Sequence, residues 1–282
     1  MILEKTIKQA SLFLKDYNIP SHELDAEIIL SNVMGVTREF LIVNNNMNIS
    51  NNMIEKYNIA IKRRAKKEPV AYIVGKKEFW SEDFLVNKAT LVPRPETELL
   101  IYKVIKYFKD KKINILDIGT GSGCILLSIL KELKNSRGIG IDISANAIKV
   151  AQSNAIKLNL SNSTKFKVCD LSKFNVGKYD LIVSNPPYIA LRDIKNLSKD
   201  IINFEPLVAL KGGVEGLDLI KKVIYKSTNL LKRNGLLAIE IGHHQYRKTT
   251  DILNKQGFKE LSKEYDCNEN IRCIISTKVK FF

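Results

Sequence analysis

The sequence is short of the residues that mark several large classes of protein. Glycine (14) and proline (7) are too few for a collagen-like or low-complexity chain of 282 residues. No run approaches the roughly 18 apolar residues that cross a membrane. Charges interrupt the N-terminal stretch MILEKTIKQASLFLKDY, so no secretory signal is expected either. We therefore expect a globular, cytoplasmic protein.

Cysteine and histidine, the residues that most often bind zinc, are also scarce. None of the 4 cysteines stands at C-x-x-C spacing from another, which removes support for a zinc knuckle, a thioredoxin-type motif or a disulfide framework. His243 and His244 are adjacent, so their side chains are expected to diverge, and His22 lies far away in the sequence. We expect no metal site.

Acidic residues are outnumbered by basic ones, 30 against 45, which gives a net charge of +15. Such a surplus suits a polyanionic partner such as a nucleic acid. The charge is nevertheless spread along a chain rich in Lys, Ile and Asn, a composition typical of AT-rich genomes. The basic cluster KRRAKK (62–67) falls on the last turns of a predicted helix, where positive charge also suits the helix dipole. Charge alone leaves nucleic-acid binding open.

The hydrophobic pattern predicts two domains joined by a linker. Apolar residues at helical spacing predict a small helical domain over 1–69, and β-rich stretches on either side of a polar turn predict a β-hairpin linker over 70–92. From 93 to 282, short apolar runs alternate with helical patterns. This alternation is typical of an α/β fold with a doubly wound, mostly parallel sheet, here with an antiparallel closing strand. The predicted helices of the first domain cover 2–14, 21–35 and 53–65. The β-rich stretches of the linker cover 72–80 and 84–92. The predicted strands of the second domain cover 113–119, 138–144, 165–170, 180–187, 235–242, 258–266 and 272–280.

A glycine-rich turn follows the first predicted strand of the second domain. Alternate glycines let the backbone approach a ligand, and the following helix offers free N–H groups at its N-terminus. The position three after the second glycine is Cys124, so the dinucleotide fingerprint G-x-G-x-x-G fails, and no Gly-Lys-Ser/Thr follows for a triphosphate. The turn consists of Gly119, Thr120, Gly121, Ser122 and Gly123.

Three acidic residues stand at the ends of three successive predicted strands. Asp117 could bind the ammonium group of a methionine moiety, Asp142 both hydroxyls of a ribose, and Asp170 the amino group of an adenine. Any one of them could instead be a helix N-cap. Together with the glycine turn, they resemble the class I S-adenosylmethionine-dependent methyltransferases.

The fourth predicted strand ends in Asn185, Pro186, Pro187 and Tyr188. Two prolines hold the chain rigid and extended at the edge of the sheet where ligands bind. An amide or exocyclic amine nitrogen is a poor nucleophile because its lone pair is delocalised. The Asn185 side-chain oxygen and the Pro186 carbonyl can accept its two N–H groups and aim the lone pair at a methyl donor, while Tyr188 stacks on the planar substrate. Positioning and electrostatics then carry the catalysis.

Asn-Pro-Pro-Tyr resembles the motif of adenine-N6, guanine-N2 and glutamine-N5 methyltransferases. The order of the other motifs is similar to that of the release-factor glutamine-N5 methyltransferase family. This resemblance implies that a methyl group passes from S-adenosylmethionine to the glutamine amide in the Gly-Gly-Gln motif of class-1 peptide-chain release factors. The motifs are PVAYIVGKKEFW (69–80), LVPRPETELL (91–100), DIGTGSG (117–123), SNPPYI (184–189), FEPLVALKGGVEGLDLI (204–220) and EIGHHQ (240–245).

The resemblance also implies roles for single residues. The glycine turn, Asp142 and Asn185 lie at the cofactor, and the residues from Asn185 to Tyr188 hold the glutamine. Leu171 stands where some relatives carry an aromatic residue beside the adenine. Arg94-Pro95-Glu96 and Glu205-Pro206 are expected to shape the substrate pocket.

Two other functions stay open. A DNA or RNA base (adenine-N6) methyltransferase is favoured by the charge and by the shared Asn-Pro-Pro-Tyr, although such an enzyme must extrude its target base. An RNA-binding protein with a vestigial pocket is the non-enzymatic alternative. We expect a monomeric enzyme that methylates a protein substrate. We expect it to require no nucleic acid and to have no membrane partner.

Overall fold

Two units make up the chain in the computed structural model, which describes residues 1–279. Unit 1 consists of Met1–Lys76 together with a short later segment, Ser198–Phe204. Unit 2 consists of Lys77–Leu197 and the chain from Glu205 onward. In the described part of the chain, no helix combines the length and the apolar character that crossing a membrane requires.

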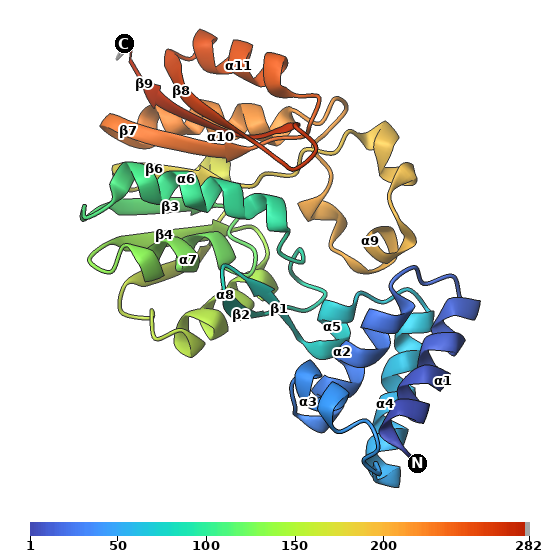
Figure 1. The fold of residues 1–282 in the computed structure, drawn as a ribbon. Coiled ribbons are helices and arrows are strands. Elements are labelled where there is room, and N and C mark those ends of the chain that lie inside the picture. The colour runs from blue at the N-terminus through green and yellow to red at the C-terminus, as the bar shows by residue number, and fades with distance from the viewer. Residues whose placement is uncertain (280–282) are drawn as a thin grey trace. The chain divides into compact units, whose positions relative to one another are not determined.

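Unit 1 is all-helical, and its predicted helices are present. The helix boundaries follow from local capping. The Ser50 hydroxyl accepts a hydrogen bond from the backbone N–H of Met53, and Gly35 ends a helix in the left-handed conformation at φ 68°. A short helix after the Thr37 cap was not predicted. The helices of unit 1 are α1 (Leu3–Asp16), α2 (His22–Met34), α3 (Arg38–Val43), α4 (Asn51–Ala65), α5 (Val70–Val74) and α9 (Lys199–Phe204) (Figure 1).

Apolar side chains from α1, α2 and α4 form the core of unit 1. Leu14, Leu30 and Tyr57 are fully buried, and the Tyr57 hydroxyl donates to the backbone oxygen of Ala26 at 3.0 Å. This hydrogen bond fixes α4 against α2 while satisfying the one polar atom of a large buried ring.

The basic cluster at the end of α4 is partly internal. The Arg64 side chain is only 7% exposed, and its guanidinium donates to Asp25 of α2 and to Asp200 of α9, each at 2.6 Å. Its neighbour Arg63 makes a two-pronged pair with Glu68, at 2.8 Å for each contact. A guanidinium occupied in this way is not free to bind phosphate, so the cluster gives little support to nucleic-acid binding.

We predict that Arg64→Met lowers the free energy of unfolding by about 3 kcal/mol or more, because it leaves Asp25 buried without its cation. Urea denaturation of the full chain measures the change. Lys62→Met, a loss of charge at an exposed position on the same helix, should change stability by less than about 0.5 kcal/mol. Equal effects of the two substitutions would contradict a structural role for Arg64.

The chain between the helical domain and the sheet differs from the prediction. The first half of the predicted strand 72–80 is wrong, because α5 occupies Val70–Val74 and ends at Gly75 with φ 81°. Pro69 before the helix and a left-handed glycine after it favour one helical turn over an extended strand. The β-rich stretch 84–92 is a strand only at its start. The hairpin itself is present and short, with β1 (Lys76–Phe79) and β2 (Glu82–Leu85).

The main sheet of unit 2 has seven strands in the order β5-β4-β3-β6-β7-β9-β8. All neighbours are parallel except that β9 runs antiparallel to β7 and to β8. The predicted doubly wound, mostly parallel sheet with an antiparallel closing strand is confirmed. The last residue of the predicted strand 272–280 lies outside the described residues. The strands are β3 (Asn114–Ile118), β4 (Arg137–Asp142), β5 (Thr164–Val168), β6 (Tyr179–Ser184), β7 (Leu231–Glu240), β8 (Phe258–Tyr265) and β9 (Ile271–Lys278).

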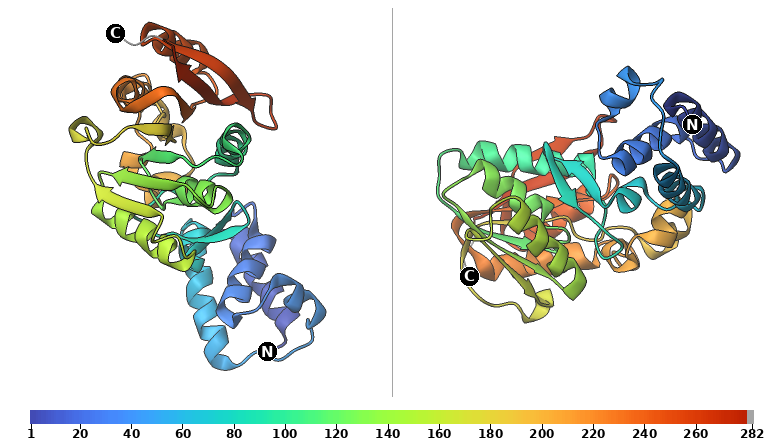
Figure 2. Two further views of the ribbon diagram at one scale, coloured as in Figure 1. Left: turned by 90° about the vertical axis from the view of Figure 1, so that its left-hand side faces the viewer. Right: turned by 90° about the horizontal axis from the view of Figure 1, so that it is seen from below.

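Helices cover both faces of this sheet, which forms the middle of three layers (Figures 1 and 2). One apolar cluster packs α6 (Glu98–Phe108), α7 (Cys124–Glu132) and α8 (Ala145–Lys157) on one face, and a second packs α10 (Asp218–Leu230) and α11 (Tyr246–Lys255) on the other. Within residues 1–279, four 3₁₀ turns lie between the helices and strands: η1 (Pro95–Thr97), η2 (Leu171–Lys173), η3 (Leu191–Asn196) and η4 (Leu207–Ala209). Connections from β3 and from β6 leave on opposite sides, so a crevice opens at the carboxyl ends of these two strands.

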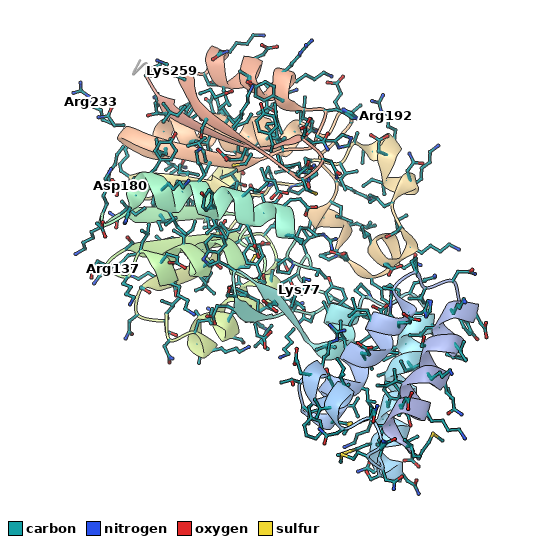
Figure 3. The ribbon with its side chains drawn as sticks, viewed as in Figure 1. Lys77, Arg137, Asp180, Arg192, Arg233 and Lys259 are labelled. Atoms are coloured by element: carbon teal, nitrogen blue, oxygen red, sulfur yellow. The ribbon has the colours of Figure 1, made fainter. Side chains whose placement is uncertain are left out.

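Positive charge in unit 2 lies on separate elements. Figure 3 labels four exposed cations: Arg233 and Lys259 at the upper left, Arg137 below them, and Arg192 on the opposite side. These four cations do not form one patch of the kind that follows a nucleic-acid backbone.

Candidate active site

A cavity of about 590 Å³ lies at the carboxyl ends of β3, β4 and β6. It brings together most of the residues singled out from the sequence, although they come from positions far apart in the chain. Among the described residues, the predicted cofactor and substrate residues that do not line the wall are Asp117, Gly123 and Tyr188, and the predicted pocket residues that do not line it are Pro95, Glu96 and Glu205. The predicted cofactor and substrate residues that do line it are Gly119, Thr120, Gly121, Ser122, Asp142, Asp170, Leu171, Asn185, Pro186 and Pro187.

The glycine turn forms one wall of the cavity. Gly119 and Gly121 adopt positive φ angles of 74° and 55°, which favour glycine. The backbone N–H groups of Gly119 and Thr120 both donate to the carbonyl of Ile141, at 2.9 and 3.0 Å. These bonds tie the turn to the end of β4, and the turn leads directly into α7, whose first N–H groups have no partner within the helix.

Asp142 ends β4 beside this turn and lines the cavity. Its two carboxylate oxygens accept from the backbone N–H groups of Gly121 at 3.0 Å and Ser144 at 2.9 Å. A carboxylate has about four acceptor positions, so two hydrogen bonds leave capacity for a pair of hydroxyl groups. The arrangement fits a ribose.

Asp117 lies behind the wall. Its carboxyl group is fully buried, with Oδ2 accepting from the Thr120 hydroxyl at 2.7 Å and Oδ1 without a hydrogen-bond partner among the described residues. Burial raises the pKa of Asp117 to about 7, although the Thr120 hydroxyl lowers it, and the nearby Asp142 adds to the rise. Asp117 therefore contacts the lining of the cavity through the Thr120 side chain.

Another part of the cavity wall combines the polar side chain of Asp170 with the aliphatic side chains of Leu171 and Ile143. Asp170 caps η2, because its Oδ1 accepts from the backbone N–H and the hydroxyl of Ser172, both at 2.7 Å. These hydrogen bonds lower the pKa of Asp170. Leu171 lines the cavity next to it, and Ile143, 60% exposed although aliphatic, lines it after Asp142. An exposed and a half-buried aliphatic side chain at the cavity wall suit a flat apolar ring system such as adenine.

Asn185 is fixed at the end of β6. The Ser184 hydroxyl donates to the carbonyl of Ile118 at 2.8 Å and so joins the ends of β6 and β3. The Asn185 side-chain Nδ2 donates to the Thr97 hydroxyl oxygen at 3.1 Å, and the Thr97 hydroxyl donates to Glu240 at 2.6 Å. Glu240 is fully buried at the end of β7, and burial raises its pKa, against hydrogen bonds from Thr97 and Tyr188 and the charge of Arg272.

Tyr188 is directed into the protein rather than into the cavity. Its hydroxyl donates to Glu240 at 3.1 Å and accepts from Arg272 at 3.0 Å, and the Arg272 guanidinium lies 5.6 Å from the ring centre. Gln245 holds the Tyr188 backbone oxygen at 2.9 Å. The hydrogen bonds involve the hydroxyl and the backbone oxygen of Tyr188, and the expected stacking of its ring on the substrate stays a prediction.

Two of the residues expected to shape the substrate pocket, Arg94 and Glu205, form an ion pair. Glu205 is almost fully buried and accepts from the guanidinium of Arg94 at 2.6 Å and from the backbone N–H of Val92 at 3.1 Å. Arg94 and Pro206 line the cavity. The pair joins the segment before η1 to the segment before η4.

The described residues contain no cluster of three or more His, Cys, Asp or Glu side chains placed to hold a metal ion. The expectation that the adjacent His243 and His244 side chains diverge is wrong, since their ring centres are 3.8 Å apart.

Thr97, Ile143, Glu240 and Arg272 were missed by the sequence analysis as site residues. Thr97 and Glu240 lie inside two motifs, RPETE and EIG, that resemble those of the methyltransferase family. The motifs were therefore recognised, but no role was assigned to these two residues. Ile143 follows the ribose acid directly, and only its exposure distinguishes it from a core residue. Arg272 carries no local signal.

A sheet in this strand order, with a glycine turn after its first strand and an acidic residue after its second, defines a class I S-adenosylmethionine-dependent methyltransferase. The glycine turn, Asp142 and the aliphatic side chains of Ile143 and Leu171 fit the three parts of that cofactor. A methyltransferase from Pyrococcus furiosus has the same fold, with a TM-score of 0.55 at 18% identity over 77% of this chain and 98% of that one.

Comparison of the sequence identifies the family. Residues 5–75 match the model of the PrmC N-terminal domain, and residues 109–274 match that of a methyltransferase domain. The release factor glutamine methyltransferase of Clostridium acetobutylicum is 36% identical over 99% of both chains. That of Buchnera aphidicola subsp. Schizaphis graminum is 39% identical over 95% of this chain and 96% of its own. The chain belongs to the release factor glutamine methyltransferases.

We predict that Asp117→Asn stabilises the protein more at pH 8 than at pH 5. The raised pKa means that native Asp117 keeps a proton that the unfolded chain has lost, so its contribution to stability falls as pH rises from about 4 to about 7. Asparagine avoids this loss. The melting-temperature difference between variant and wild type should grow by several degrees across this range, whereas the exposed Asp251→Asn should show a constant difference. A constant difference for Asp117→Asn would show that the native carboxyl is ionised throughout.

Proposed function

We propose that this protein transfers the methyl group of S-adenosylmethionine to the side-chain amide nitrogen, N5, of the glutamine in the Gly-Gly-Gln motif of class-1 release factors. The observation that carries the proposal is the fixed carboxamide of Asn185, followed by two prolines, in the wall of the cavity. The names of the relatives supply the substrate class, and the site supplies chemistry suited to an amide.

The reacting nitrogen needs two acceptors. A free amide nitrogen shares its lone pair with the carbonyl group and is a weak nucleophile. We infer that the Asn185 Oδ1 and the Pro186 backbone oxygen each accept one of its N–H groups, which holds the amide in place and turns its lone pair toward the methyl donor. The cofactor supplies an activated methyl group. Asn185 and Pro186 supply orientation, and no strong base is required.

The cofactor contacts in this proposal come from four places. Residues Gly119 to Gly121 face its methionine part, Asp142 its ribose, and Ile143 and Leu171 its adenine. Asp170 keeps its second oxygen as a possible acceptor for the adenine amino group, in addition to its capping role. We propose that Asp117 and Gly123 act from behind the wall, by shaping the turn.

Selection of the substrate requires more than the amide pocket, because any exposed glutamine side chain has the same amide. We propose that unit 1 is a substrate-recognition domain that contacts the folded release factor, so that a second weak contact raises the effective concentration of the glutamine at the cavity. In this proposal the protein is a cytoplasmic monomer and nucleic acid is not required. The base methyltransferase alternative is not favoured, since Arg63 and Arg64 of the basic cluster are already paired.

The experiment that tests the function is a transfer assay. Methyl-labelled S-adenosylmethionine is incubated with the protein and a class-1 release factor, with the same release factor carrying alanine in place of the motif glutamine, or with duplex DNA and RNA. Label should enter only the unaltered release factor, and mass spectrometry should place it on the motif glutamine. Label in nucleic acid and none in the release factor would overturn the proposal.

We predict that Asn185→Ala lowers the rate of methyl transfer by about 10²–10³, the scale observed when one positioned hydrogen-bonding group is removed from an active site. Affinity for the cofactor, measured by isothermal titration calorimetry, should change less than about threefold. Asn162→Ala makes the same replacement at an exposed position and serves as the control. Near-normal turnover of Asn185→Ala would remove Asn185 from the acceptor role.

A further inference from the structure

Glu240 joins the two ends of the Asn185–Tyr188 motif from beneath the cavity. One of its oxygens accepts from Thr97 at 2.6 Å and the other from Tyr188 at 3.1 Å. The carboxyl group is buried, and a buried carboxylate that accepts from two separate hydroxyl groups has a strong directional effect on both. Neither Glu240 nor Thr97 has a part in the transfer step described above.

The direction of each hydrogen bond in this chain follows from the number of protons available. The Thr97 hydroxyl donates its single proton to one oxygen of Glu240. The Thr97 oxygen can then only accept from Asn185. The carboxamide must therefore present its NH₂ group to Thr97, in agreement with the 3.1 Å contact from Nδ2.

The second arm of the network works in the same way. The Tyr188 hydroxyl accepts from Arg272 at 3.0 Å, so its own proton also points to Glu240. With Gln245 on its backbone oxygen, Tyr188 is held at three points. The stretch that carries Asn185 and Pro186 is thus fixed at its first and its last residue.

We propose that Glu240 and Thr97 are positioning residues that set which end of the Asn185 carboxamide faces the substrate. The buried carboxylate orients the Thr97 hydroxyl, which binds the Asn185 NH₂ group and leaves Oδ1 as the acceptor for the substrate amide. Without this relay the carboxamide can rotate by half a turn. It would then offer a donor to the N–H groups of the substrate, which repels them. The inference rests on the proposed function of Asn185 and extends it.

The matched pair Thr97→Val and Thr97→Ser tests the relay, because valine keeps the shape of threonine without the hydroxyl and serine keeps the hydroxyl. Thr97→Val should lower kcat for release-factor methylation by about 10- to 100-fold, with KM and the Kd for S-adenosylmethionine changed less than threefold. Thr97→Ser should keep at least one third of wild-type kcat. Glu240→Gln should lower kcat as Thr97→Val does, and melting curves report whether each variant is folded.

The double variant Thr97→Val/Asn185→Ala shows whether the effect passes through Asn185. If it does, the double variant is no slower than Asn185→Ala alone. The inference would be overturned if the losses in kcat of the two single variants multiplied in the double variant, or if Thr97→Val kept wild-type kcat. Either result would leave the proposed function intact.

A second measurement does not depend on activity. In an NMR spectrum of the free protein, the side-chain NH₂ signals of Asn185, identified by their loss in Asn185→Ala, should exchange slowly with water in the wild type and in Thr97→Ser. They should exchange much faster in Thr97→Val. Equal exchange in all three would also overturn the inference, even if the wild type methylated no release factor.

Discussion

The position of β3 between β4 and β6 is the constraint on which the site depends. Because β3 is parallel to both neighbours and the chain leaves on opposite sides, the ends of three strands converge without covering one another. The glycine turn, Asp142 and Asn185 each follow one of these strands. Two contacts hold the ends in register, from the glycine turn to Ile141 and from Ser184 to Ile118. The cavity is therefore a consequence of sheet topology.

Buried carboxyl groups give this fold much of its local order. Asp25 and Glu240 are each at most 5% exposed. Burial of a charge is costly, so such groups are stable only where several donors or a cation meet them at once. Each one therefore permits a narrow set of arrangements around it. Asp25 requires Arg64, and Glu240 requires two hydroxyl groups. With apolar packing alone, the side chains around these carboxyl groups could adopt several rotamers.

The sequence was sufficient to predict the sheet, the glycine turn and the Asn185 motif, because each depends on residues that are close together in the chain. Strands of the sheet are short apolar runs, and the turn is read from alternate glycines. The helix over Val70–Val74 was mistaken for a strand because its apolar residues also suit a strand, and only Pro69 and Gly75 decide the matter.

The contacts around Asn185 could not be predicted in this way. Thr97 lies 88 positions from Asn185 and 143 from Glu240. No periodicity connects such residues, and only the folded sheet brings them together. Tyr188 illustrates the same limit. Its residue type suits stacking on a substrate, but the hydrogen bonds to Glu240 and Arg272 turn the ring inward. Arg64 likewise looked like part of a surface charge cluster until its two carboxylate partners were in place.

The short helix α9 has a consequence for the modularity of the protein. It lies in the segment Ser198–Phe204, which packs as part of unit 1 although the chain before and after it belongs to unit 2. The backbone thus passes from one unit to the other three times, and Asp200 on α9 completes the ion cluster of Arg64. A gene fragment that encodes only the first 76 residues would lack this carboxylate, and one that begins after them would carry α9 without its core. A single crossover in the gene therefore cannot exchange either unit as a whole between relatives.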